Sequence, residues 1–298
     1  MRLKDLRNWV TGGGDAAPPP ARASPPSGLP VPSAPAPTAP ATWPRERLAF
    51  AHQLWDEGFI GPGGSEEILR RATPLGLSAA SSLLLLGAGA GGPARCVATL
   101  FGAWVDGYET DPALVARANA VCAAAGLGKR VRIDLWNPAA PGFAPHSCHH
   151  ALAFDPFRAV PPSRVLDSLA RTLRPGGQLS LLATASAPDF DPEANEVATW
   201  SALDMRACAP PAVAAVSRAL ADCGFDVRVT EDLTGPHAHQ IVTAWRSWVR
   251  TITAAGARPS PAQAAVIVRE AELWLRRVRL LRAGGLRWVR WHAILKPG

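Results

Sequence analysis

Leu83-Leu84-Leu85-Leu86-Gly87-Ala88-Gly89-Ala90-Gly91-Gly92-Pro93 is the stretch that decides the fold. An unbroken apolar run that ends in glycines is typical of a strand buried on both faces, as at the centre of a parallel sheet. Glycine accepts positive φ and lets the backbone approach a ligand closely. The segment that follows, 94–100, can begin a helix whose N-terminus faces that ligand. The stretch therefore predicts the strand, turn and helix of a ligand-binding α/β fold.

An acidic residue, Glu109, follows the glycine turn at the spacing of a nucleotide-binding fold. A second strand is expected over 103–108, and it ends at Glu109. This lies about twenty residues beyond the glycines, where nucleotide-binding folds place the acid that accepts both ribose hydroxyls. A tight turn with a solvated glutamate is the alternative, but the order of strand, glycines, helix and acid favours an adenosine-type cofactor site. Because Glu109 would face a cleft, we expect it to have no partner within the protein.

Composition limits the class of protein. The chain has 298 residues, of which 48% are hydrophobic, enough to bury a sizeable core. Its five cysteines are scattered without a Cys-x-x-Cys pair, which favours a reducing, cytoplasmic location over a disulfide framework or a zinc site. No metal site is expected. No apolar run approaches the roughly 20 residues of a membrane span, and the start lacks the apolar segment of a secretory signal.

The N-terminal part differs from the rest. Residues 1–11 read as a short basic amphipathic segment, either a frayed tail or a weak contact with a membrane surface or partner. Residues 12–44 read as a linker rich in proline and alanine. Eleven of the thirty prolines fall between Pro18 and Pro44, so this linker is expected to be disordered or extended.

The net charge of +7 is concentrated in the last thirty residues. The preferred interpretation is a solvated helix face, with arginine stems lying over apolar surface. An anionic substrate or a membrane surface nearby is the alternative. Nucleic acid is not expected as a partner, because no recognised binding module accompanies the charge. The basic residues are Arg269, Arg276, Arg277, Arg279, Arg282, Arg287, Arg290 and Lys296.

Predicted strands and helices alternate along the domain, which is expected to span 45–298. The strands are expected at 82–86, 103–108, 130–135, 149–154, 177–183, 225–230 and 286–295. The helices are expected at 45–56, 65–72, 94–101, 112–125, 162–173, 211–223, 238–254 and 261–282. This alternation predicts a mostly parallel sheet with helices on both faces.

From about Phe50 to Pro297 the chain resembles the class I S-adenosylmethionine-dependent methyltransferases. The glycine turn Gly87–Gly91 and the strand end Gly107-Tyr108-Glu109 look like the cofactor motifs of this family. Leu173-Arg174-Pro175-Gly176-Gly177 looks like its turn before the fifth strand. The resemblance implies a Rossmann-like seven-stranded sheet whose last strand is antiparallel. It also implies that S-adenosylmethionine is the cofactor and that the methyl acceptor is a small molecule with an N- or O-nucleophile.

Within that class the chain is most similar to the phosphoethanolamine-type small-molecule N-methyltransferases. The segment 58–64, Gly-Phe-Ile-Gly-Pro-Gly-Gly, resembles their loop over the cofactor, and 231–234, Glu-Asp-Leu-Thr, resembles their acidic turn after the sixth strand. Together with the glycine turn and the strand ends, the resemblance implies a set of cofactor-binding residues. They are Phe59, Ile60, Gly87, Ala88, Gly89, Gly91, Glu109, Trp136 and Asn137.

Two residues are candidates for the chemistry. Asp155 is expected at the carboxyl end of the fourth strand, as a base or as the partner of a substrate amine, or instead as a cap for the helix near Pro161. His237 is expected after the sixth strand, either in the substrate pocket or exposed in a loop. Some tryptophans would line a cavity or belong to the core: Trp43, Trp55, Trp200, Trp245 and Trp248.

The sequence also departs from the family pattern. Leu85 stands where the family has an acid two residues before the first glycine, and Asn137 stands where it has Asp. These changes leave open a degenerate methyltransferase-like protein that binds without catalysis. A nicotinamide-dependent oxidoreductase is a third hypothesis, because Gly87, Gly89 and Gly92 also satisfy Gly-x-Gly-x-x-Gly. The Leu-Arg-Pro-Gly-Gly motif and the final strand speak against this third hypothesis.

Overall fold

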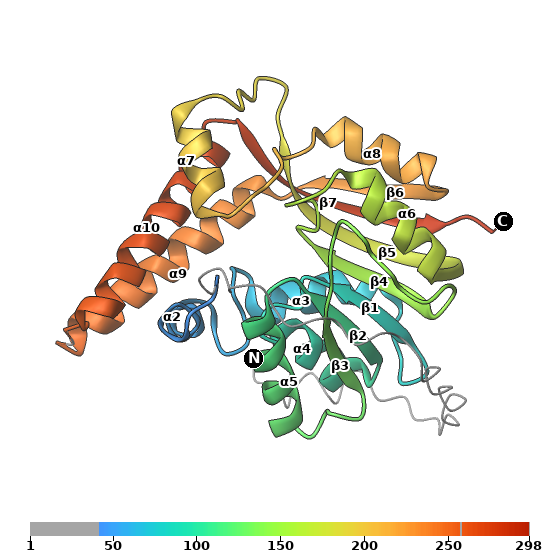
Figure 1. The fold of residues 1–298 in the computed structure, drawn as a ribbon, viewed down its shortest axis with the longest axis horizontal. Helices are drawn as coiled ribbons and strands as arrows, with labels where there is room; N and C mark the ends of the chain where they lie inside the picture. Colours follow the sequence, from blue (N-terminus) through green and yellow to red (C-terminus); the bar gives the residue numbers. More distant parts are fainter. Residues whose placement is uncertain (1–41, 257, 298) are drawn as a thin grey trace, which may run out of the picture.

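A seven-stranded sheet is the frame of the structure, a computed structural model that describes residues 42–256 and 258–297 (Figure 1). The strands lie in the order β3-β2-β1-β4-β5-β7-β6. Neighbours from β3 to β5 are parallel, whereas β7 is antiparallel to both β5 and β6. The bounds are β1 Ser82–Leu86, β2 Trp104–Glu109, β3 Val131–Leu135, β4 Cys148–Phe154, β5 Leu173–Ser186, β6 Phe225–Asp232 and β7 Leu286–Leu295. The predicted seven-stranded sheet with an antiparallel last strand is confirmed.

The predicted helices are all present, with ends shifted by a few residues. They are α2 Arg45–Trp55, α3 Gly64–Ala72, α4 Gly92–Phe101, α5 Pro112–Ala124, α6 Pro162–Thr172, α8 Val213–Asp222, α9 Thr234–Ala254 and α10 Pro261–Arg282. A short 3-10 helix, η1, covers Thr73–Leu75, and α7, Asn195–Leu203, was not expected. Helix α7 buries Val197 and Trp200, and two apolar positions in one turn are too few to establish a helical period. The prediction for 1–11 and, apart from residues 42–44, the prediction for the linker 12–44 fall outside the described residues.

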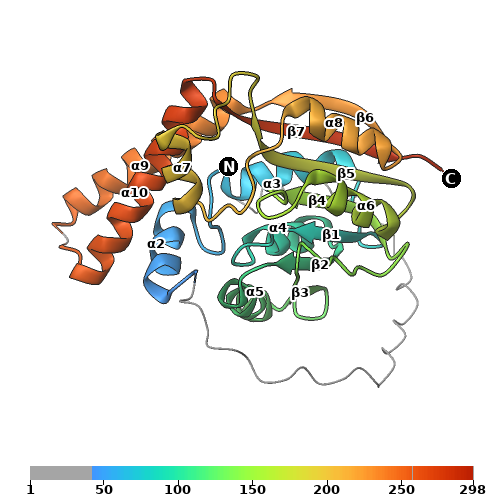
Figure 2. The same ribbon diagram turned by 45° about the horizontal axis from the view of Figure 1, so that its top comes forward.

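Strand β1 is buried on both faces, as the apolar run predicted. Leu83 and Leu85 belong to the core that includes α3, α4 and α5, whereas Leu84 and Leu86 belong to the core under α6 and α8. The alternation follows from the two-residue period of a strand. Figure 2 shows α6 and α8 on one side of the sheet and α4 and α5 on the other.

Helices α9 and α10 connect β6 to β7 and form an antiparallel pair that projects from the sheet beside α2 and α7 (Figures 1 and 2). Their sheet-proximal ends bring side chains to the same edge of the sheet as the ends of β1, β2 and β4. Although α9 and α10 have 21 and 22 residues, no helix among the described residues is long and apolar enough to cross a membrane.

Strand β5 begins earlier than expected. Leu173 pairs with Cys148 and Gln178 with His150, so the intervening residues form a bulge in β5. Gly176, at φ 76°, lies in this bulge. The Leu-Arg-Pro-Gly-Gly motif is therefore part of the strand, and its placement as a turn before the strand was wrong.

Candidate active site

The glycine turn after β1 lies against the loop 58–64. The Gly92 amide donates to the Gly58 carbonyl over 2.8 Å, which joins the two segments. Gly89 has φ 56°, and a Cβ there would lie 3.2 Å from Cγ1 of Ile60. The turn therefore has no room for a larger residue, and it forms a cradle of backbone with Phe59 and Ile60 beside it.

Glu109 closes this cradle from the end of β2. Its Oε2 accepts from the Gly89 amide at 2.9 Å, and its Oε1 accepts from the Thr110 amide at 2.7 Å and from the Thr110 hydroxyl at 3.2 Å. Burial raises the pKa of Glu109, against the opposing effect of these hydrogen bonds. The expectation that this carboxylate has no protein partner was wrong, because the turn folds back far enough to reach it.

A cavity of about 460 Å³ opens at the carboxyl edge of the sheet. It lies between β1 and β4, where the order of successive strands in the sheet reverses, and α/β sheets bind ligands at such a point. Most residues predicted for the site line it: Phe59, Ile60, Gly87, Gly89, Glu109, Trp136, Asp155 and His237. The structure thus brings together residues that the sequence spreads over almost 180 positions.

Three predicted cofactor residues do not line this cavity. Ala88 is fully buried in the core. Gly91 packs on α5, where a Cβ would lie 2.9 Å from the Cα of Ala118. Asn137 is exposed, and its Oδ1 accepts from the Ala139 amide at 2.9 Å. The first two shape the turn from behind, and the third stabilises its own loop.

Asp155 lies at the end of β4 with φ 46°. Its Oδ1 accepts from the Thr184 amide at 3.0 Å, and its Oδ2 accepts from the Thr184 hydroxyl and from Arg206. Burial alone would raise the pKa of Asp155, but Arg206, Arg158 and Arg277 hold it below its ordinary value. Asp155 does not cap α6, because its oxygens accept from Thr184 and Arg206 and the N-cap of α6 is Pro161. The carboxylate is therefore ionised and well bonded.

His237 lies in the first turn of α9, which begins four residues earlier than expected, so it is buried rather than exposed in a loop. Its ring stacks on Trp288 with centroids 4.7 Å apart and 21° between planes. Its Nε2 accepts from Nε of Arg277 at 3.2 Å. Burial, followed by the charge of Arg277, places the pKa of His237 well below 6.5. The ring is therefore neutral, with its proton on Nδ1.

An arginine cluster on the same side was not predicted. Arg206 donates to Oδ2 of Asp204 over 2.8 Å, Arg158 forms an ion pair with Asp204 at 3.1 Å, and Arg277 donates to the Thr184 hydroxyl over 3.0 Å. Arg158 and Arg206 lie outside helices and strands, where no period could mark them. Arg277 did carry a signal, because it shares the helical face of Leu273 and Leu281, both buried, at spacings of four.

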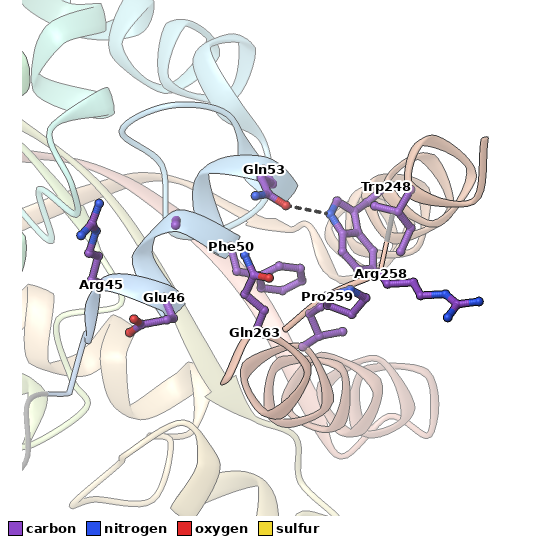
Figure 3. Close-up of a pocket in the computed structure, with 11 residues that line it drawn as sticks. Arg45, Glu46, Phe50, Gln53, Trp248, Arg258, Pro259 and Gln263 are labelled. Atoms are coloured by element: carbon purple, nitrogen blue, oxygen red, sulfur yellow. Dashed lines mark hydrogen bonds between the residues drawn. The ribbon is translucent and has the colours of Figure 1, made fainter. Parts of the chain in front are cut away.

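The tryptophans divide between this cavity, the core and a second cavity. Those lining the cavity at the sheet edge are Trp43, Trp136, Trp274 and Trp288. Of the others considered from the sequence, Trp55, Trp200 and Trp245 belong to the core or pack against it. Trp248 lines a separate cavity of about 450 Å³ between α2, α9 and α10. Figure 3 shows Gln53 there, with its Oε1 accepting from Nε1 of Trp248.

Comparison with known proteins agrees with this geometry. Residues 84–181 match a family model described as a methyltransferase domain. A search of the curated proteins returns no match.

Solved structures with the same fold are distant in sequence. A Galdieria sulphuraria protein, provisionally described as a sarcosine dimethylglycine methyltransferase, has a TM-score of 0.69 at 16% identity, over 84% of this chain and 98% of that one. A Haemonchus contortus phosphoethanolamine N-methyltransferase, solved with phosphomonomethylethanolamine and S-adenosylhomocysteine, has a TM-score of 0.73 at 19% identity, over 86% of this chain but 59% of that one.

A third structure is the geranyl diphosphate C-methyltransferase of Streptomyces coelicolor A3(2), solved with Mg²⁺, geranyl diphosphate and S-adenosylhomocysteine. Its TM-score is 0.60 at 15% identity, over 85% of this chain and 99% of that one. Residues 84–181 thus match a methyltransferase domain, and the chain has the fold of S-adenosylmethionine-dependent methyltransferases of known structure.

Proposed function

We propose that this chain transfers a methyl group from S-adenosylmethionine to a small molecule bound in the cavity at the sheet edge. The observation that carries the proposal is the junction of Glu109 with Gly89. This hydrogen bond holds a buried carboxylate beside the backbone of the glycine turn, and both line the cavity. A carboxylate in this place suits a ribose diol, since Oε2 accepts from Gly89 alone and has a further acceptor site, and Oε1 gains one when the Thr110 hydroxyl turns away.

The residues present fit the cofactor. Glu109 would hold the ribose, and the backbone at Gly87 and Gly89 would lie against the amino-acid part, where side chains would collide. Phe59 and Ile60 would cover it from the loop 58–64. When bound, S-adenosylmethionine supplies a methyl group already activated by the sulfonium, so the protein has mainly to orient the acceptor and exclude water.

The two candidate catalytic residues suit different tasks. Asp155 is a weak base, because Arg206 and Thr184 occupy its oxygens and its pKa is low. It would fix the position of Arg206 and keep negative charge at the end of β4. Nε2 of His237 is already engaged by Arg277, so the ring would act through its Nδ1 proton or by packing. An acceptor nitrogen or oxygen that arrives deprotonated requires no further base.

A second candidate function is binding without catalysis. Leu85 is fully buried, so no carboxylate is available at its position in β1, and Asn137 lies outside the cavity. Both residues could weaken the hold on the cofactor without blocking the cavity to ligands.

Calorimetry with S-adenosylhomocysteine and with NAD tests the proposal. We expect S-adenosylhomocysteine to bind at one site per chain and NAD to bind far more weakly. Tight binding of NAD alone would contradict the proposal. Tight binding of S-adenosylhomocysteine, with no methylated product from a broad panel of amines, carboxylates and phenols, would favour the binding protein.

We also propose a cytoplasmic, reducing location. The five cysteines are scattered in sequence without a Cys-x-x-Cys pair, a pattern that suits a chain working among reduced thiols. Labelling of intact cells with a membrane-impermeant thiol reagent, followed by fractionation, tests this location.

A further inference from the structure

The buried side chain of Arg206 pairs with Asp155 and Asp204. Four other arginines are buried in the described part of the chain: Arg47, Arg71, Arg277 and Arg290. Three of them pair with carboxylates. Arg47 lies 2.8 Å from Glu270, Arg71 lies 2.6 Å from Glu67, and Arg290 lies 3.3 Å from Glu231. Among the described residues, Arg277 is the buried arginine with no carboxylate within 4.0 Å, although it is only 5% exposed and lines the cavity. Its protein partners are the neutral groups of His237 and Thr184.

The charges around Arg277 do not balance. The charges that act on Arg277 belong to two carboxylates, Asp155 and Asp204, and to two other guanidinium groups, Arg158 and Arg206. Both carboxylates already accept from Arg206. Even so, Nη1 of Arg206 is buried without a hydrogen-bond partner. These four neighbours balance one another, and Glu109 acts on Arg158. The excess is therefore the one positive charge of Arg277 itself.

Such an excess is costly in a buried place unless something neutralises it. A buried charge without a partner has lost much of its hydration, which raises the free energy of the folded protein. An opposite charge with hydrogen-bond acceptors offsets this desolvation cost. A guanidinium offers a fork of donors that fits a carboxylate or a phosphate. Because Arg277 faces the cavity, a ligand can supply that anion.

The side chains around Arg277 indicate the chemical character of the rest of the ligand. Its guanidinium lies 5.3 Å from the ring centre of Trp288 and 5.9 Å from that of Trp274. Both indoles and Leu273 line the cavity. An anionic head at Arg277 would thus continue into an apolar or aromatic body.

We propose that the methyl acceptor carries an anionic group, a carboxylate or a phosphate, and that Arg277 binds this group in the cavity. The inference rests on the proposed function, whose acceptor it describes. It assigns to the binding site one arginine of the basic C-terminal segment, which the sequence alone favoured as a solvated face.

The test uses the full chain saturated with S-adenosylhomocysteine and three small probes, benzoate, phenyl phosphate and the neutral benzamide. Binding is measured by calorimetry and by the fluorescence of the cavity tryptophans. We expect at least one anionic probe to bind at least tenfold more tightly than benzamide. In Arg277→Met this preference should fall at least tenfold, since a charge-assisted hydrogen-bonded pair is lost. The matched control, Arg279→Met, removes an exposed arginine of the same helix and should bind as wild type.

Each outcome supports or overturns the proposal. Arg277→Lys keeps the charge but not the planar fork, so it should bind the better anion with intermediate affinity, and it serves if Arg277→Met does not fold. Whether benzoate or phenyl phosphate binds more tightly decides between a carboxylate and a phosphate. Equal affinity for benzamide and both anions, or unchanged anion binding in Arg277→Met, would overturn the proposal. The same titrations without S-adenosylhomocysteine keep this test separate, because failure of that ligand to bind counts against the proposed function instead.

Discussion

Replacing Glu109 by Gln removes the charge at the end of β2 and one of its two acceptor oxygens, with little change of shape. In the protein, Oε1 accepts from both donors of Thr110 and Oε2 accepts from the Gly89 amide. If the Gln oxygen keeps Thr110, its NH₂ group faces the Gly89 amide, and two donors then oppose each other.

Two effects of different size should follow. For the protein alone, the loss of the Gly89 hydrogen bond is partly offset by relief from burying a charge, and we expect the free energy of unfolding to fall by about 1 kcal/mol. For S-adenosylhomocysteine, the loss of a charged acceptor for the ribose should weaken binding by about 1.5–3 kcal/mol, roughly ten- to a hundredfold. Calorimetry measures the second effect and urea unfolding the first.

Two controls separate the ribose contact from general weakening. Asp134→Asn removes a partly exposed carboxylate from the neighbouring strand and should change neither quantity appreciably. An analogue of S-adenosylhomocysteine that lacks both ribose hydroxyls should bind to wild type and to Glu109→Gln with the same affinity. Unchanged affinity of Glu109→Gln for S-adenosylhomocysteine itself would refute the assignment of Glu109 to the ribose.

Three further changes test neighbouring parts of the account. Gly89→Val places a branched side chain against Ile60 at positive φ. We expect S-adenosylhomocysteine to bind more than tenfold more weakly and the free energy of unfolding to fall by about 1–2 kcal/mol. An affinity equal to that of wild type would place the cofactor elsewhere. A chain that begins at Trp43 should unfold cooperatively and bind S-adenosylhomocysteine as the full chain does; loss of either would show that the proline-rich segment is needed. Because the folded pKa of His237 is depressed, the unfolded chain takes up this proton first, so stability is lost as pH falls below about 6.5. His237→Gln should flatten part of that loss in unfolding experiments at a series of pH values, and an unchanged slope would contradict the neutral assignment.

Local sequence patterns were enough to predict the frame of this fold. The four leucines of β1 predicted a strand buried on both faces, the glycines predicted the turn, and Glu109 predicted the end of β2. Each of these features depends on residues that are neighbours in the chain. The antiparallel position of β7 came from the family resemblance. The register of β5 could not be predicted, since its bulge depends on pairing with β4.

Much of the site depends on contacts between distant segments. Arg206, 51 residues away, keeps Asp155 ionised. Burial, and then the charge of Arg277, 40 residues away, keeps His237 neutral. Asn137 was expected in the site from its position after β3, but a local hydrogen bond holds its side chain outside the cavity. Strand ends thus predicted which residues line the cavity, whereas the partners of each side chain required the folded structure.

Hydrogen exchange of the full chain, with and without S-adenosylhomocysteine, tests most directly whether the cavity at the sheet edge is the cofactor site. We predict slower exchange in 58–64, 87–92 and 109–114 when the ligand is bound. The second cavity provides an internal control, because peptides from 48–53 and 258–267 should exchange at the same rate in both samples. Protection confined to those control peptides, or unchanged exchange in 87–92 at saturating ligand, would contradict the account.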